Sequence, residues 1–143
     1  IEVYFRNGKL EGKGFYNQGK YEGLIEKYYE NGQLWVESNY VDGKKQGILK
    51  RYYTNGQLKG IANYENDKLN GDYLTYYLDG VLYIKAFYKF GKKEGLFEMF
   101  YENGKLKRKG IYENGLEDGP YEEYSENGEL QRKGIFKKGI RIN

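Results

Sequence analysis

Apolar side chains return along this chain in one fixed pattern: two aromatic residues, an Asn-Gly or similar pair, and a leucine. Tyr28-Tyr29-Glu30-Asn31-Gly32-Gln33-Leu34 is one copy, and the pattern recurs every 24 residues, starting at positions 4, 28, 52, 76, 100 and 124. Asn-Gly between apolar runs is typical of a β-hairpin, because both residues tolerate the positive φ angles of a type I′ turn. The chain therefore repeats one hairpin unit about six times.

Each unit predicts two strands, which in the second copy run from about Leu24 to Glu30 and from about Gln33 to Val41. Asp42-Gly43 then makes the turn into the next copy. Tyrosine and β-branched residues favour strands, and such frequent glycines would disrupt a helix. We expect an all-β fold: an elongated, twisted antiparallel β-meander of about six tandem 24-residue β-hairpin repeats. We expect residues 1–143 to form a single repeat domain that is part of a longer chain, with units of about 1–23, 24–47, 48–71, 72–95, 96–119 and 120–143.

Two-residue turns at both sites fix a register. They predict these opposed pairs: Tyr29 and Leu34, Ile25 and Ser38, Gly23 and Tyr40, Ser38 and Gly47, and Val36 and Leu49. Both turns preserve parity, so one face of the sheet continues through all units. That face carries large rings beside small residues at every second strand, which are Gly14, Ser38, Ala62, Ala86, Gly110 and Gly134. Aromatic rings packing over nearly bare backbone are expected there.

The opposite face carries Tyr28 and a mostly charged remainder. In the predicted register Glu2 faces Lys13, and the same combination recurs as Glu98 with Lys109 and Glu122 with Lys133. Such opposite-charge pairs support the register. Glu26 facing Glu37 speaks against it.

Composition and charge narrow the function classes. The 143 residues contain 18 tyrosines, 21 glycines, 24 basic and 21 acidic side chains, for a net charge of +3. Bases and acids nearly balance, so we do not expect nucleic acid or a membrane surface as the partner. No apolar run reaches membrane-spanning length, and no signal peptide is visible. The chain starts at Ile1 inside a repeat, so the sequence leaves open a removed upstream segment, and with it a cytoplasmic or an exported location.

No enzymatic chemistry is indicated. Histidine and cysteine are absent, which removes the common nucleophile–base pairs and most zinc sites. The carboxylates lie mostly in turns or at exposed strand positions, where solvated charges are the rule. We therefore predict no catalytic residue, no cofactor and no metal site.

Binding is the more informative question, because repeat proteins bind through positions that vary on a constant frame. Four residues replace the usual charged or polar side chains at positions assigned to the charged face: Trp35, Ile61, Leu74 and Tyr83. The predicted register places them near Tyr52 and Tyr76. Apolar side chains on a polar face predict a contact patch for another protein. The alternative is that the sheet curls and this face is its inner core.

Tyr-Tyr-x-Asn-Gly-x-Leu followed by Gly-Lys-x-x-Gly, as in Gly43-Lys44-Lys45-Gln46-Gly47, resembles the variant MORN repeat of bacterial proteins (membrane occupation and recognition nexus). The resemblance covers essentially the whole chain. It implies β-hairpin units in an elongated sheet and a binding role, through protein contacts or, in eukaryotic relatives, lipid-related ones. Many bacterial proteins with this variant are described as antitoxins of toxin–antitoxin systems. The eukaryotic pattern carries Gly-x-x-His-Gly, and this chain has no histidine, so the resemblance supports lipid binding only weakly.

The first hypothesis is therefore a non-catalytic interaction module that recognises another protein. A second is a structural element whose open sheet edges pair with other copies, because the strands at Ile1-Glu2-Val3-Tyr4 and Ile140-Arg141-Ile142 lack a capping sequence. A third class left open is an antitoxin that neutralises a partner toxin, or an enzyme.

Overall fold

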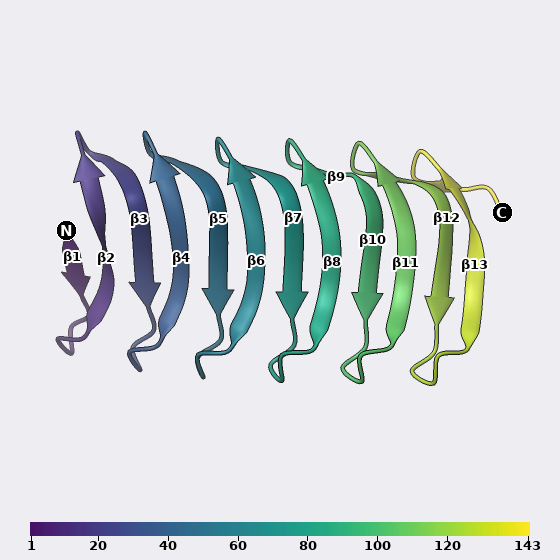
Figure 1. The fold of residues 1–143 in the computed structure, drawn as a ribbon, viewed down its shortest axis with the longest axis horizontal. Helices are drawn as coiled ribbons and strands as arrows, with labels where there is room; N and C mark the ends of the chain where they lie inside the picture. Colours follow the sequence, from purple (N-terminus) through teal and green to yellow (C-terminus); the bar gives the residue numbers. More distant parts are fainter.

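The computed structural model describes residues 1–143 as one open antiparallel sheet without helices (Figure 1). Its 14 strands are β1 (Glu2–Tyr4), β2 (Leu10–Asn17), β3 (Lys20–Tyr28), β4 (Leu34–Val41), β5 (Lys44–Tyr52), β6 (Leu58–Glu65), β7 (Lys68–Tyr76), β8 (Leu82–Lys89), β9 (Lys92–Lys93), β10 (Gly95–Phe100), β11 (Leu106–Glu113), β12 (Leu116–Tyr124), β13 (Leu130–Lys137) and β14 (Ile140–Arg141). Each strand pairs with its sequence neighbours, except that both β9 and β10 pair with β8. The predicted all-β meander of tandem hairpins is confirmed.

The strands follow one another from the purple N-terminal end to the yellow C-terminal end, and the long ones are bowed (Figure 1). Neighbouring strands lie about 4.8 Å apart, so equivalent residues of successive two-strand units lie about 10 Å apart. Each unit contacts only its neighbours, as in other repeat proteins.

The turn at Asn31-Gly32 differs from the prediction. A type I′ turn needs positive φ at both central residues, but only Gly32 has it, with φ 89°. The Gly32 N–H donates to the Tyr29 carbonyl at 2.9 Å, so the turn spans residues 29–32 and β3 ends at Tyr28. The Asn31 side-chain oxygen accepts the Gln33 N–H at 3.0 Å, an Asx-type bond. Asparagine is therefore used here for its side-chain acceptor.

This longer turn changes the register at the hairpin end. Leu34 lies opposite Tyr28, not Tyr29, while Val36 lies opposite Lys27. One extra residue, Trp35, therefore stands on β4 as a β-bulge.

The second kind of turn is as predicted, with φ 51° at Asp42 and 80° at Gly43. The register beyond it is not: Ser38 lies opposite Leu49 rather than Gly47, and Val36 opposite Arg51 rather than Leu49. Two extra residues of β5 form a bulge there, which Gly47 accommodates at φ 81°. A shift of two residues leaves every side chain on its original face, so the predicted continuity of the faces survives.

The core is one row of side chains across the sheet in which large and small residues alternate. Register pairs join Ile25 to Ser38, Ser38 to Leu49 and Leu49 to Ala62, and all four are buried. The row continues through Tyr73, Ala86, Phe97, Gly110, Tyr121 and Gly134. We refer to the side of the sheet that carries this row as the packed face. Large side chains over small neighbours, as the sequence predicts, bury a core within a single layer.

Hydrogen bonds join each unit to the next on the packed face. The hydroxyl of Tyr29 donates to the Tyr52 carbonyl at 2.8 Å. The same 2.8 Å bond recurs 24 residues later each time, from Tyr53 to the Tyr76 carbonyl, from Tyr77 to the Phe100 carbonyl and from Tyr101 to the Tyr124 carbonyl. The second tyrosine of the repeated pair therefore connects the units.

Candidate functional site

The face opposite the packed face carries a ladder of charges. Consecutive strands present, in register, Glu2, Lys13, Glu26, Glu37, Lys50, Ile61, Leu74, Lys85, Glu98, Lys109, Glu122 and Lys133. We call this side the ladder face. The predicted opposite-charge pairs are present, and so is the unfavourable contact of Glu26 with Glu37. Lysines on either side compensate it, with Lys13 2.9 Å from Glu26 and Lys50 3.2 Å from Glu37.

Two of the predicted site residues interrupt this ladder at its middle. Ile61 and Leu74 lie directly opposite each other on β6 and β7, between Lys50 and Lys85. Both side chains are half-buried. Lys85 is exposed, lies between Leu74 on β7 and Glu98 on β10, and forms no ion pair within 4.0 Å. This apolar pair flanked by lysines is called the ladder gap.

Tyr52 and Tyr76 also belong to this surface. The Tyr52 hydroxyl donates to a Glu37 carboxylate oxygen at 2.9 Å. Burial, and then this bond to a carboxylate, raise the pKa of Tyr52 to about 12. Tyr76 is the equivalent of Tyr52 one unit later and lies two residues from Leu74 on β7. Ile61 occupies the position equivalent to Glu37, so Tyr76 has no glutamate there to accept its hydroxyl proton. The Tyr76 hydroxyl forms no hydrogen bond within the chain.

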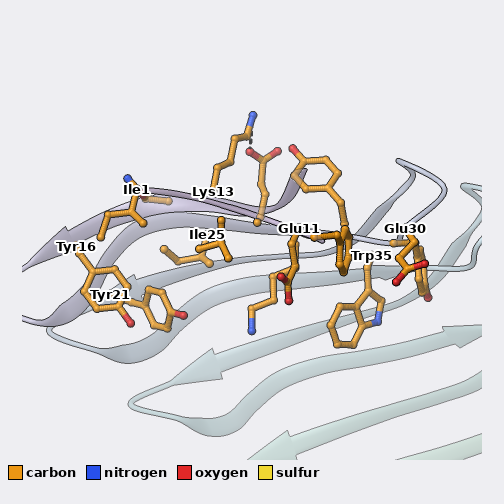
Figure 2. Close-up of a pocket in the computed structure, with 16 residues that line it drawn as sticks. Ile1, Glu11, Lys13, Tyr16, Tyr21, Ile25, Glu30 and Trp35 are labelled. Carbon is orange, nitrogen blue, oxygen red and sulfur yellow. Dashed lines mark hydrogen bonds and ion pairs between the residues drawn. The ribbon is translucent and has the colours of Figure 1, made fainter. Parts of the chain in front are cut away.

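Trp35 and Tyr83 were assigned to this same surface by the sequence, and that assignment is wrong. Trp35 is the bulge residue of its hairpin, and its ring lies 6.0 Å from that of Tyr29. Figure 2 shows Trp35 on the same side of the sheet as Ile25 and Tyr21, with Lys13 on the other side. Tyr83, the equivalent residue 48 positions later, stacks on Tyr77 with ring centroids 4.6 Å apart. The six predicted site residues therefore divide between two faces.

The packed face beside Trp35 is hollowed in two places. A groove of about 520 Å³ at the N-terminal end includes Tyr16, Tyr21, Ile25 and Trp35 in its lining, and it extends to the ladder-face residues Lys13, Glu26 and Tyr28 (Figure 2). A second hollow of about 240 Å³ over β3–β6 is lined by ten residues: Ile25, Lys27, Trp35, Val36, Ser38, Tyr40, Lys45, Leu49, Arg51 and Tyr64. Three of these are cations and none is acidic.

Lysine and arginine side chains on this face lie over aromatic rings. Lys45 lies 5.1 Å from the centroid of Tyr64, and Lys93 lies 4.9 Å from that of Tyr112. Desolvation by burial raises the pKa of Tyr112. At these distances the cations are held against the rings by cation–π attraction.

The ladder face also carries exposed apolar side chains that were not predicted from the sequence. A second row of the ladder face lies between the charge ladder and the turns that connect successive units. It carries the exposed apolar side chains Phe15, Leu24, Ile48, Phe87, Leu96 and Ile135. Their positions alternate with buried residues of the packed face, such as Leu24 beside Ile25. The signal was present in the sequence as residues that neighbour the core positions in every unit.

No group of three or more acidic residues is placed to hold a metal ion. Arg108 forms ion pairs with both Glu117 and Glu123, so two carboxylates of the packed face are paired within the chain. None of the structure's segments is a candidate membrane-spanning helix.

Comparisons with known proteins give one strong result and several weak ones. No curated protein sequence matches this chain. A crystal structure of an S. aureus TarM mutant in complex with fondaparinux, alpha-GlcNAc-glycerol and UDP is similar over 76% of this chain and 21% of that chain, with 11% identity and a TM-score of 0.44. A crystal structure of TarM is similar over 73% of this chain and 21% of that chain, with 10% identity and a TM-score of 0.42. At these scores the likeness carries no argument.

The strong result comes from the repeat itself. The family described as "MORN repeat variant" matches six consecutive stretches, residues 1–18, 21–42, 45–66, 69–90, 93–114 and 117–138. These stretches together cover most of the chain, and their spacing is that of the Asn-Gly hairpins and Tyr29-type bonds described above. The chain therefore belongs to the MORN repeat variant family, with six tandem copies.

Proposed function

We propose that this chain is a non-catalytic module that binds another protein through the ladder gap. MORN repeats are generally modules of protein or membrane interaction. The observation that carries the proposal is the Ile61–Leu74 pair, which replaces a lysine–glutamate pair at the centre of an otherwise charged row. An apolar centre with a charged rim is the composition of many protein interfaces.

The charges around the gap indicate the partner's chemistry. Lys50 and Lys85 flank the apolar pair. Lys50 forms an ion pair with Glu37, whereas Lys85, which lies opposite Glu98, forms none. A partner that presents apolar side chains next to a carboxylate would pair with Lys85 while covering Ile61 and Leu74. The free hydroxyl of Tyr76 adds a hydrogen-bonding group at the border, and tyrosine is enriched at such positions.

The chain itself supplies the sharpest test. Ile61→Lys with Leu74→Glu recreates the pair seen at Lys109 and Glu122, whose charged atoms lie 2.8 Å apart. The double variant should fold like the wild type, since it restores the ladder. Affinity capture with the tagged chain, followed by mass spectrometry, should recover a protein with the wild type and lose it with the double variant.

A matched control lies on the other face. Trp35→Lys introduces the residue found at the equivalent Lys59 and Lys107, so it removes an exposed apolar ring without touching the gap. This variant should retain the captured protein. Capture that survives the double variant, or that is lost equally in the control, contradicts the proposal. An antitoxin that neutralises a toxin is one form of this proposal, and a captured protein whose toxicity the chain suppresses would establish it.

Assembly through sheet edges is a second proposal, favoured by the short edge strands. β1 has three residues and β14 two, and Ile1, Val3, Ile140 and Ile142 beside them are exposed. Unpaired backbone groups at such edges can pair with another strand. Light scattering over a concentration series should then show association, and a monomer at every concentration would contradict it.

A further inference from the structure

The near balance of bases and acids over the whole chain does not describe the packed face. Basic side chains outnumber acidic ones there, with Lys27, Lys45, Arg51, Lys59, Lys93, Lys107, Arg108, Arg132 and Arg141 against Glu11, Glu117 and Glu123. The charge ladder of the other face carries five lysines and five glutamates. The fold therefore separates an excess of positive charge onto one side, and that excess is invisible in the net charge.

Most of these cations are free to meet a ligand. Arg108 occupies both Glu117 and Glu123. Six other cations of this face form no ion pair within the chain: Lys27, Lys45, Arg51, Lys59, Lys93 and Lys107. Lys27, Lys45 and Arg51 line one hollow that contains no acidic residue. Uncompensated cations in a hollow attract anions, since the walls concentrate their field.

Aromatic rings and cations alternate along the same face. In each of the four middle units, one residue lies over the Tyr29-type tyrosine of its own hairpin. These residues are in order Trp35, Lys59, Tyr83 and Lys107. Successive members lie about 10 Å apart, so the row extends about 30 Å. Trp35 is 44% exposed, with its ring open to solvent at one end of the row. Such a row suits a linear ligand that carries both anionic and flat aromatic groups.

We propose that the packed face binds single-stranded nucleic acid. Phosphates would lie against Lys27, Lys45 and Arg51, and a base would stack on Trp35. Single-strand binding surfaces combine a basic groove with aromatic rings, and the stacking is tolerant of sequence because every base has a π-face. A duplex keeps its bases stacked on each other, so it would engage the cations alone. The row's length corresponds to a site of several nucleotides.

The only tryptophan in the chain gives a direct readout. Titration of the full chain with a 16-residue deoxythymidine oligonucleotide should quench Trp35 fluorescence, because a stacked base contacts the indole. Heparin and inorganic polyphosphate carry the charge without bases and should leave this fluorescence nearly unchanged. Binding of all three with equal affinity and no quenching would assign the face to anionic polymers in general and overturn the proposal. Absence of any binding at low salt would also overturn it.

Two charge variants with matched properties locate the surface. Lys27→Gln with Arg51→Gln removes two exposed, unpaired cations from the packed face. Lys85→Gln with Lys133→Gln removes two exposed, unpaired cations from the ladder face. The first should weaken oligonucleotide binding by about tenfold at low salt. It should also reduce the slope of log affinity against log salt by about 1.4, since each neutralised phosphate contributes about 0.7. Equal effects of the two variants would refute the assignment.

A third variant separates stacking from charge. Trp35→Ala keeps every cation, and it should weaken the binding of a fluorescein-labelled oligonucleotide by about tenfold, the usual loss for one stacked base. Binding of polyphosphate should be unaffected. The Ile61→Lys with Leu74→Glu variant should bind the oligonucleotide like the wild type. Failure of the ladder-gap proposal and failure of this one are therefore distinguishable. Loss of oligonucleotide binding in that ladder variant would contradict the separation of the two faces.

Discussion

Tyr77→Phe tests whether the tyrosine bonds between units stabilise the sheet. The Tyr77 hydroxyl donates to the Phe100 carbonyl at 2.8 Å, and it is the only atom that the substitution removes. The ring keeps its contact with Tyr83, 4.6 Å away between centroids. Burial raises the pKa of Tyr77, in keeping with a partly desolvated hydroxyl that gains from its bond.

A neutral hydrogen bond contributes about 1 kcal/mol net, because folding exchanges a bond to water for one within the protein. Tyr77→Phe should therefore lower the free energy of unfolding by about 1 kcal/mol. For a chain of this size that corresponds to a Tm lower by about 3 °C. In a repeat protein stability is close to a sum of unit and interface contributions, so the loss should be confined to the interface that this bond crosses.

Urea unfolding followed by circular dichroism gives the free energy, and amide hydrogen exchange shows where it is lost. Exchange should accelerate in β8 and β10 and remain unchanged in β2 and β3. Tyr76→Phe is the matched control, since it deletes a hydroxyl one residue earlier that has no partner within the chain. Equal destabilisation by both variants would refute the reasoning. Phe5 lacks the hydroxyl in the first unit, so Phe5→Tyr should add stability of the same size.

Three further perturbations have definite signs. Burial and Glu37 hold the pKa of Tyr52 at about 12, above the value near 10 in an unfolded chain. The folded state therefore keeps this proton longer, and stability is full below about pH 10 and falls as the pH rises to 12. Tyr52→Phe should remove that part of the fall, measured by urea unfolding at pH 9 and 11.5. Arg108→Gln should cost about 1–3 kcal/mol, measured the same way, because it leaves the Glu117 carboxylate without an ion-pair partner and Glu123 with only the 3.8 Å contact to Arg132. Gly119→Ala should cost more than 1 kcal/mol by thermal unfolding, because Gly119 has φ 133° and the new methyl would lie 3.1 Å from a carbon of Ile111.

The last two perturbations have controls within the chain. Arg132→Gln should change stability little, because this exposed arginine lies 3.8 Å from Glu123 and is screened by solvent. Gly23→Ala meets no atom within 4 Å and should cost only the backbone strain at φ 70°. If stability falls with pH in Tyr52→Phe as it does in the wild type, the cause given for the raised pKa of Tyr52 is contradicted. Equal losses of stability in Arg108→Gln and Arg132→Gln, or in Gly119→Ala and Gly23→Ala, would contradict the explanation given for that pair.

The sequence by itself determined the period, the strands and the two faces. Side chains alternate between the two faces of a strand, and a bulge of two extra residues leaves each side chain on its face. Ile25, Ser38 and Leu49 could therefore be placed on one face without coordinates. The alternation of large and small residues along the core row followed from the same parity. The opposed charges of Glu122 and Lys133 and the second kind of turn were predictable for the same reason.

Only the tertiary structure decided the hairpin ends and the division of the candidate site. Asn31 caps its turn with its side chain, which adds one residue to the loop and makes Trp35 a bulge. A one-residue change reverses the face on which a side chain lies, so Trp35 and Tyr83 move away from Ile61 and Leu74. The same reversal places Lys59 and Lys107 over tyrosine rings of the packed face. The observed turn includes a side-chain-to-backbone bond, from the Gln33 N–H to the Asn31 side-chain oxygen. Pattern alone cannot resolve which turn forms, yet the turn determines which residues a partner would meet.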